Sequence, residues 1–241
     1  MIKFFRKIRY DLVDKNKTGK YLKYAIGEIV LVVIGILIAL SISNWNEKRK
    51  HNNTIKGVYS IIKSDLLTDI KTIDKVLVST KFRDSIFKRV INKEMTYDDY
   101  LNCNLCMNIL GGFPDIKLKT RELELLEQNS TILNSYQDSL SIEINNFYSS
   151  FNIEIDVAIQ EVITDYKENR TYFKNNMTWF EDYQKMVFNE DFVKYALTSI
   201  DYRNRVISFN SLYYDIYLGF LRQYKEGAYK LIENIDKELE K

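Results

Sequence analysis

The sequence predicts an all-α protein, with a single N-terminal transmembrane helix followed by an antiparallel helical-bundle domain. Only one proline and eight glycines occur in 241 residues, so few positions break a helix. Residues 25–43 form an apolar run with a single charge, and apolar residues then recur at three- and four-residue steps through much of the chain. We therefore expect three segments: a basic amphipathic segment (1–23), a transmembrane helix (24–45) and a helical soluble domain (46–241).

The transmembrane helix is predicted from AIGEIVLVVIGILIALSIS, residues 25–43. At 1.5 Å per residue this run extends about 28 Å, which matches the hydrocarbon thickness of a bilayer. Tyr21 and Tyr24 precede the run and Trp45 follows it, as expected of interfacial anchors. A core helix of a soluble protein is an alternative, but such helices rarely stay apolar on every side for about five turns. A cleaved signal peptide is disfavoured, because its apolar region is usually about 7–15 residues long.

Basic residues are concentrated before the apolar run. Residues 1–24 contain eight Lys and Arg against two Asp, a net charge of +6, whereas the rest of the chain carries 27 basic and 31 acidic side chains. This distribution favours an anionic membrane surface as partner over nucleic acid. Only five Lys and Arg follow the run up to residue 63. The positive-inside rule therefore predicts a cytoplasmic N-terminus and a C-terminal domain outside the cytoplasm.

The opening MIKFFRKIRYDLV suggests a second contact with lipid. Phe4 and Phe5 share one helical face with Met1, Ile8 and Leu12, while the basic residues lie largely away from it. This pattern is typical of an interfacial helix on an anionic leaflet. A disordered basic tail has the same composition and remains an alternative.

Small residues on one side of the apolar run suggest a packing face. Such residues permit close approach of a second copy or of a membrane-protein partner. An ionisable group in a span usually faces such a partner, although Glu28 lies near the cytoplasmic end, where headgroups or lysines explain it equally well. The predicted face consists of Glu28, Val32, Gly35, Ala39 and Ser43.

The opening MIKFFRKIR and the run KYAIGEIVLVVIGILIALSISNWNEKRK, residues 23–50, carry a family resemblance. These residues resemble the N-terminal signature of an uncharacterised Bacteroidota family of single-span membrane proteins, described as a domain of unknown function. The matching positions are Gly27, Glu28, Gly35, Asn44, Trp45 and Asn46. The resemblance implies a membrane anchor and a helical domain, and it implies no activity.

Beyond the membrane segment, the apolar spacing predicts three long helices and one or two short ones. The first is expected to continue directly from the transmembrane helix. The expected elements are Asn53–Asn92, a short helix at Tyr97–Leu110, a short helix or turn at Thr120–Gln128, a second long helix over Ile144–Tyr166, and a last helix that begins after Asn189. The apolar face of the last helix is predicted to contain Val193, Leu197, Ile200, Ile207, Tyr213, Ile216, Phe220, Tyr224, Ala228, Ile232 and Ile235.

Cys103-Asn104-Leu105-Cys106 is the one short motif that can carry chemistry. The pair lies in a helical pattern without strands nearby, which favours two small core residues one turn apart. A local disulfide formed outside the cytoplasm and a catalytic or metal-binding pair are the alternatives. Neither the single histidine, His51, nor any other motif suggests a catalytic site, a cofactor or a metal.

The sequence therefore predicts a non-enzymatic protein that acts through protein–protein contacts at the membrane. The rival function is a sensory or ligand-binding bundle that signals through a membrane partner. Aromatic residues of the last helix could line its pocket, although at helical spacing they are more often core. These residues are Tyr213, Tyr214, Tyr217, Phe220, Tyr224 and Tyr229.

Overall fold

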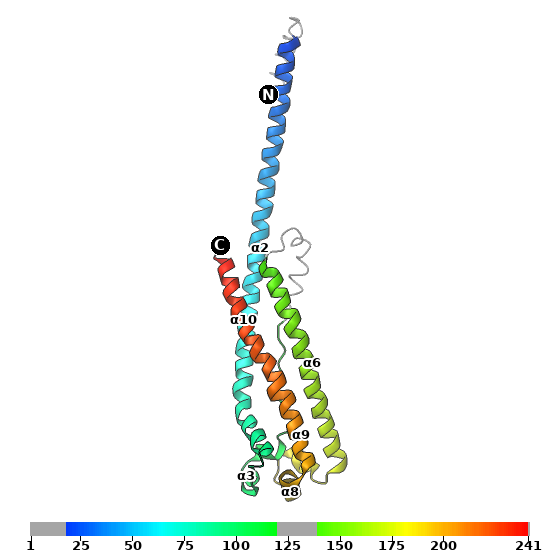
Figure 1. Cartoon of the computed structure of the whole chain (residues 1–241). Coiled ribbons are helices and arrows are strands. Elements are labelled where there is room, and N and C mark those ends of the chain that lie inside the picture. Colours follow the sequence, from blue (N-terminus) through cyan, green and yellow to red (C-terminus); the bar gives the residue numbers. More distant parts are fainter. Residues whose placement is uncertain (1–17, 120–138, 241) are drawn as a thin grey trace. The chain divides into compact units, whose positions relative to one another are not determined.

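The computed structural model describes residues 18–119 and 139–240, of which 87% are helical. The described ranges contain no strand, which confirms the all-α class. The chain divides into two compact units, Met1–Ile55 and Lys56–Lys241. Helix α2, Thr18–Ile91, begins in the first unit and ends in the second (Figure 1).

Two of the predicted elements lie outside the described residues. They are the interfacial helix that contains Phe4 and Phe5, and the short helix or turn at Thr120–Gln128.

α2 is one uninterrupted helix of 74 residues, so the first soluble helix does continue from the apolar run, as predicted. It ends in a Schellman motif, in which Lys93 adopts a left-handed φ of 62°. The N–H groups of Lys93 and Glu94 donate to the carbonyls of Val90 (3.2 Å) and Arg89 (2.8 Å). These bonds satisfy carbonyls at the helix end and offset the roughly 1–2 kcal/mol that a non-glycine residue costs in this conformation.

In the second unit, α2 lies beside α6 (Ser139–Asn176) and α10 (Leu218–Leu239) (Figure 1). α10 is antiparallel to both, because early residues of α2 and α6 meet late residues of α10. The contacts are Lys63–Asp236 and Asp74–Lys225 with α2, and Glu143–Asn234 and Phe147–Tyr224 with α6. Tyr59 and Ser141 share a hydrogen bond of 2.8 Å between their hydroxyls. α2 and α6 therefore run parallel to each other.

Residues 114–119, here called the return segment, carry the chain back along the bundle. This return allows α2 and α6 to run parallel. At its start, the carbonyl of Pro114 accepts the hydroxyl of Tyr213 at 2.8 Å. At its end, the N–H of Lys119 lies 3.3 Å from the carboxylate of Asp69, which also accepts the hydroxyl of Tyr224. This return segment thus moves toward the C-terminal end of α10 before α6 begins.

The prediction of a single short helix at Tyr97–Leu110 is wrong. It forms α3 (Tyr97–Leu101) and a 3₁₀ helix, η1 (Asn104–Asn108). The break arises at Asn102, whose N–H and side-chain amide both donate to the carbonyl of Asp98. Cys103 then has an extended backbone, with φ −137° and ψ 93°. Asparagine commonly ends helices because its side chain competes for backbone groups.

The last predicted helix begins where expected, because the side chain of Asn189 accepts the N–H of Phe192 at 3.1 Å. It does not continue, however, but divides into α8 (Glu190–Thr198) and α9 (Ile200–Asn210). Ser199 ends one helix and caps the next: its N–H donates to Tyr195, and its hydroxyl accepts the N–H of Tyr202 at 3.3 Å. A further short helix, α7 (Phe180–Lys185), precedes α8.

A π-helix, η2 (Ser211–Tyr217), joins α9 to α10. The break at Ser199 and the wider turns of η2 change which residues face the core, so part of the predicted apolar face is wrong. Ile200, Ile207 and Ile216 are 69%, 43% and 42% exposed. The residues buried over this stretch are Tyr202, Val206, Phe209, Tyr213, Tyr214 and Tyr217.

Candidate functional site

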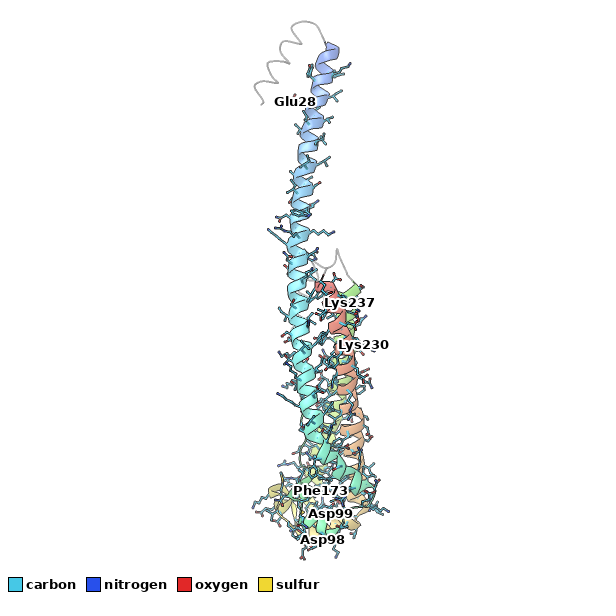
Figure 2. All side chains as sticks on the ribbon, turned by 90° about the vertical axis from the view of Figure 1, so that its left-hand side faces the viewer. Glu28, Asp98, Asp99, Phe173, Lys230 and Lys237 are labelled. Carbon is cyan, nitrogen blue, oxygen red and sulfur yellow. A yellow bond between two sulfur atoms is a disulfide. The ribbon has the colours of Figure 1, made fainter. Side chains whose placement is uncertain are left out.

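The first unit presents an apolar helical surface on every side. Among the described helices, α2 alone is long and apolar enough to cross a membrane, starting from Leu22. Every residue from Ile29 to Trp45 is exposed, and Figure 2 shows side chains projecting around this part of the helix. Exposed apolar surface is unfavourable in water by about 25 cal/mol per Å². The surface is therefore suited to lipid or to an apolar protein partner.

The predicted packing face lies on one side of α2, because its residues follow at three- and four-residue steps. Glu28 is half-buried, whereas Val32, Gly35, Ala39 and Ser43 are exposed. A Cβ atom added to Gly35 would meet no described atom within 4 Å, apart from its own helix backbone. The described chain therefore leaves this face open to another helix.

Two of the predicted interfacial anchors are exposed, Tyr24 by 57% and Trp45 by 62%. Tyr21 lies in α2 as well. The guanidinium carbon of Arg49 lies 5.3 Å from the ring centroid of Trp45, within range for a cation–π contact. This contact places a positive charge just beyond the apolar run, where lipid headgroups would lie.

The interior of the second unit contains a buried carboxylate that sequence reasoning missed. Asp69 is only 3% exposed. It accepts the hydroxyl of Tyr224 at 2.9 Å and the N–H of Lys119, while the Lys119 ammonium donates to Asp65 at 2.8 Å. Burial raises the pKa of Asp69, and the hydrogen bond from Tyr224 acts in the opposite direction. This buried polar cluster joins α2, the return segment and α10.

Aromatic rings fill the end of the second unit that holds α3 and α8. Phe173 lies in this region (Figure 2), and its ring centroid is 5.2 Å from that of Trp179. Arg205 borders the cluster, with its guanidinium carbon 3.7 Å from the centroid of Tyr172. The other members are Tyr183, Phe192, Tyr195 and Tyr202. These contacts are typical of a packed core, and burial raises the pKa of the Tyr202 hydroxyl well above its usual value.

Cys103 and Cys106 are joined by a disulfide at the start of η1. Cys106 is 3% exposed, whereas Cys103 is half-buried. The N–H of Cys106 donates to Cys103 Sγ at 3.2 Å. Just beyond the pair, Arg83 of α2 donates through Nε and Nη2 to the carbonyl of Ile109. The loop that holds the cysteines is thus tied to α2.

A model described as "Family of unknown function (DUF6090)" matches residues 28–200, which is more than half of the chain. The chain belongs to this family. No curated protein and no solved structure gives a significant match. The expected family is therefore confirmed, while its bacterial group and N-terminal signature stay predictions.

This DUF6090 protein also has a cleft between the return segment and α6. Its volume is about 430 Å³, within the usual range for small-molecule sites. Asp115 on one wall accepts a hydrogen bond from the hydroxyl of Tyr217, at 3.1 Å. A residue of η2 therefore helps to position this wall of the cleft. Polar and apolar side chains alternate along both walls: Asp115, Ile116, Lys117, Leu118, Asn152, Ile155, Asp156, Ile159 and Gln160.

The sequence could not reveal the cleft or the buried polar cluster in this DUF6090 member. Asp69 and Tyr224 are 155 residues apart in sequence, and Asp115 and Tyr217 are 102 apart. Within the described residues, no group of three or more His, Cys, Asp or Glu side chains is placed to hold a metal ion.

Proposed function

We propose that this protein is a membrane-anchored helical protein that acts through protein–protein contacts at a bacterial inner membrane. The role proposed for this membrane contact is structural or interactive and not enzymatic. The observation that carries it is the helix surface from Ile29 to Trp45, which is apolar and exposed on every side. The partner is a second copy of the chain or another membrane protein, packed against the face that contains Gly35 and Ala39.

A cytoplasmic N-terminus and a periplasmic second unit belong to the same proposal. The excess of basic residues before the apolar run supports this orientation. The disulfide between Cys103 and Cys106 also supports it, because disulfides persist mainly outside the cytoplasm.

An association assay in membranes tests the packing face. Gly35→Ile and Ala39→Ile should each weaken cross-linking of the full-length protein several-fold, because a large side chain prevents the close approach of a second helix. Val33→Ile is the control and should have no effect, since Val33 lies about 160° from Gly35 and about 120° from Ala39 around the helix. Equal cross-linking of all three variants would leave α2 as an anchor only.

A second function, a ligand-binding bundle that signals through a membrane partner, is favoured by one observation, the cleft beside the return segment. Native mass spectrometry of the full-length protein should then detect a co-purified small molecule. Asn152→Leu should reduce its occupancy, whereas Ser149→Leu, on the same helix outside the cleft, should not. An unliganded mass for the wild-type protein under mild conditions would argue against this function.

A further inference from the structure

We propose that Cys103 and Cys106 form a thiol–disulfide exchange site, in which Cys103 is the sulfur that reacts with an external protein dithiol. The proposal goes beyond the contact role above and does not depend on it.

The two cysteine residues differ in exposure. Cys106 is 3% exposed and lies inside η1, whereas Cys103 is half-buried at the start of that helix. Exchange requires the attacking thiolate to reach the sulfur that it attacks. Cys103 is therefore the point of entry, and Cys106 is the partner that forms or releases the internal bond.

The local hydrogen bonding also distinguishes the two sulfurs. The backbone N–H of Cys106 donates to Cys103 Sγ at 3.2 Å. A hydrogen bond to a sulfur favours its thiolate, and the thiolate is the reactive form. After reduction, the accessible sulfur is thus also the one whose thiolate the backbone stabilises.

The disulfide should contribute little to the stability of the fold. It closes a loop with a sequence separation of only three, so it restricts the unfolded chain much less than a disulfide across a long loop. The flanks are held without it. Before the pair, Thr96 and Asp99 form a capping box; after the pair, Arg83 donates to Ile109. The fold should therefore survive reduction.

The exchange is balanced with a dithiol as the only co-reactant. Its first thiolate attacks Cys103 Sγ, the internal S–S bond breaks, and Cys106 takes the electron pair and a proton. The second thiol of the dithiol, as a thiolate, then attacks the dithiol sulfur that is bonded to Cys103. This attack releases Cys103 as a thiolate, which is protonated. The cysteine pair gains two electrons and two protons, and the dithiol becomes a disulfide.

Two variants of the full-length protein test the assignment. Cys106→Ser leaves Cys103 free, and Cys103→Ser is its matched control with Cys106 free. With oxidised glutathione as the probe, Cys106→Ser should form the mixed disulfide at least about tenfold faster, as followed by intact mass. Equal rates, or a faster Cys103→Ser variant, would overturn the proposal.

The wild-type protein gives an independent test if a variant does not fold. Dithiothreitol should reduce the disulfide while the aromatic fine structure of the near-UV circular dichroism stays unchanged, and brief alkylation should label Cys103 before Cys106. Either resistance to reduction until the protein unfolds, or loss of the near-UV signal on reduction, would identify a purely structural disulfide and refute the exchange site.

Discussion

Gly227 of α10 faces two half-buried rings of α6, those of Phe147 and Phe151. A Cβ atom added there would lie 2.8 Å from Cε2 of Phe147 and 3.5 Å from Cε2 of Phe151. The Phe147 ring cannot withdraw freely, because its centroid is 4.9 Å from that of Tyr224 and 5.1 Å from that of Phe151. We therefore expect Gly227→Ala to displace the Phe147 ring.

The magnitude follows from two opposing effects. Replacing glycine by alanine inside a helix is favourable by roughly 1 kcal/mol. Forcing an extra carbon against packed rings costs about 1–3 kcal/mol when the rings are fully buried, and these rings are half-buried, so the lower part of that range applies. Gly227→Ala should therefore change the stability by between about zero and 1 kcal/mol in the destabilising direction. Gly219, also in α10, is the control: an added Cβ meets nothing within 4 Å there, so Gly219→Ala should gain roughly 1 kcal/mol.

Thermal unfolding of the full-length protein in detergent, followed by near-UV circular dichroism, measures this difference. For a domain of this size, 1 kcal/mol shifts the midpoint by about 2–4 °C. Gly219→Ala should melt above the wild type and Gly227→Ala at or below it. Adding Phe147→Leu to Gly227→Ala should cost less than the two separate changes together, because the clash is then relieved. A similar rise in midpoint for both alanine variants would refute the reasoning.

Three further predictions concern orientation, acid stability and capping. A reporter that is active only outside the cytoplasm should work when fused after Lys241 and stay silent after Lys20; the reverse pattern would reverse the topology. The hydrogen bond from Arg89 holds the pKa of Asp99 at about 2, below its usual 3.8. The stability from this pair is present above about pH 4 and is lost as pH falls toward 2, so Asp99→Asn should flatten acid denaturation curves in that interval. Ser199→Ala should lower the unfolding free energy by about 1 kcal/mol through loss of a helix cap, and an unchanged urea midpoint would contradict this.

Local signals in the sequence predict the structure correctly where one residue, or a short pattern, determines where a helix begins or continues. Asn189 is followed by two acidic residues and an apolar pattern, and the helix does begin there. The apolar run and the pattern after it likewise predicted a helix that continues from one to the other, because nothing in between breaks it. Such features depend on neighbours within a few positions.

Other features were not predicted, either because a local signal is ambiguous or because the partners are far apart in sequence. Ser199 caps a helix through Tyr202, three residues away, but a serine within an apolar helical pattern does not by itself indicate a cap. The burial of Asp69 depends on Tyr224 and on the return segment. The cysteine pair was favoured as two core residues within a helix, but the helix is interrupted beside it at Asn102.

The pairing of α2 with α10 has a consequence for biosynthesis. The contacts Lys63–Asp236 and Asp74–Lys225 join residues 173 and 151 positions apart. A ribosome releases the chain from its N-terminus, so these partners of α2 emerge only after 173 and 151 further positions have been synthesised. Until then the apolar face of α2 in the second unit has no α10 to cover it. We therefore expect nascent or C-terminally truncated chains to need a chaperone and to be degraded rapidly, which pulse-chase labelling of a chain ending at Ser211 would measure.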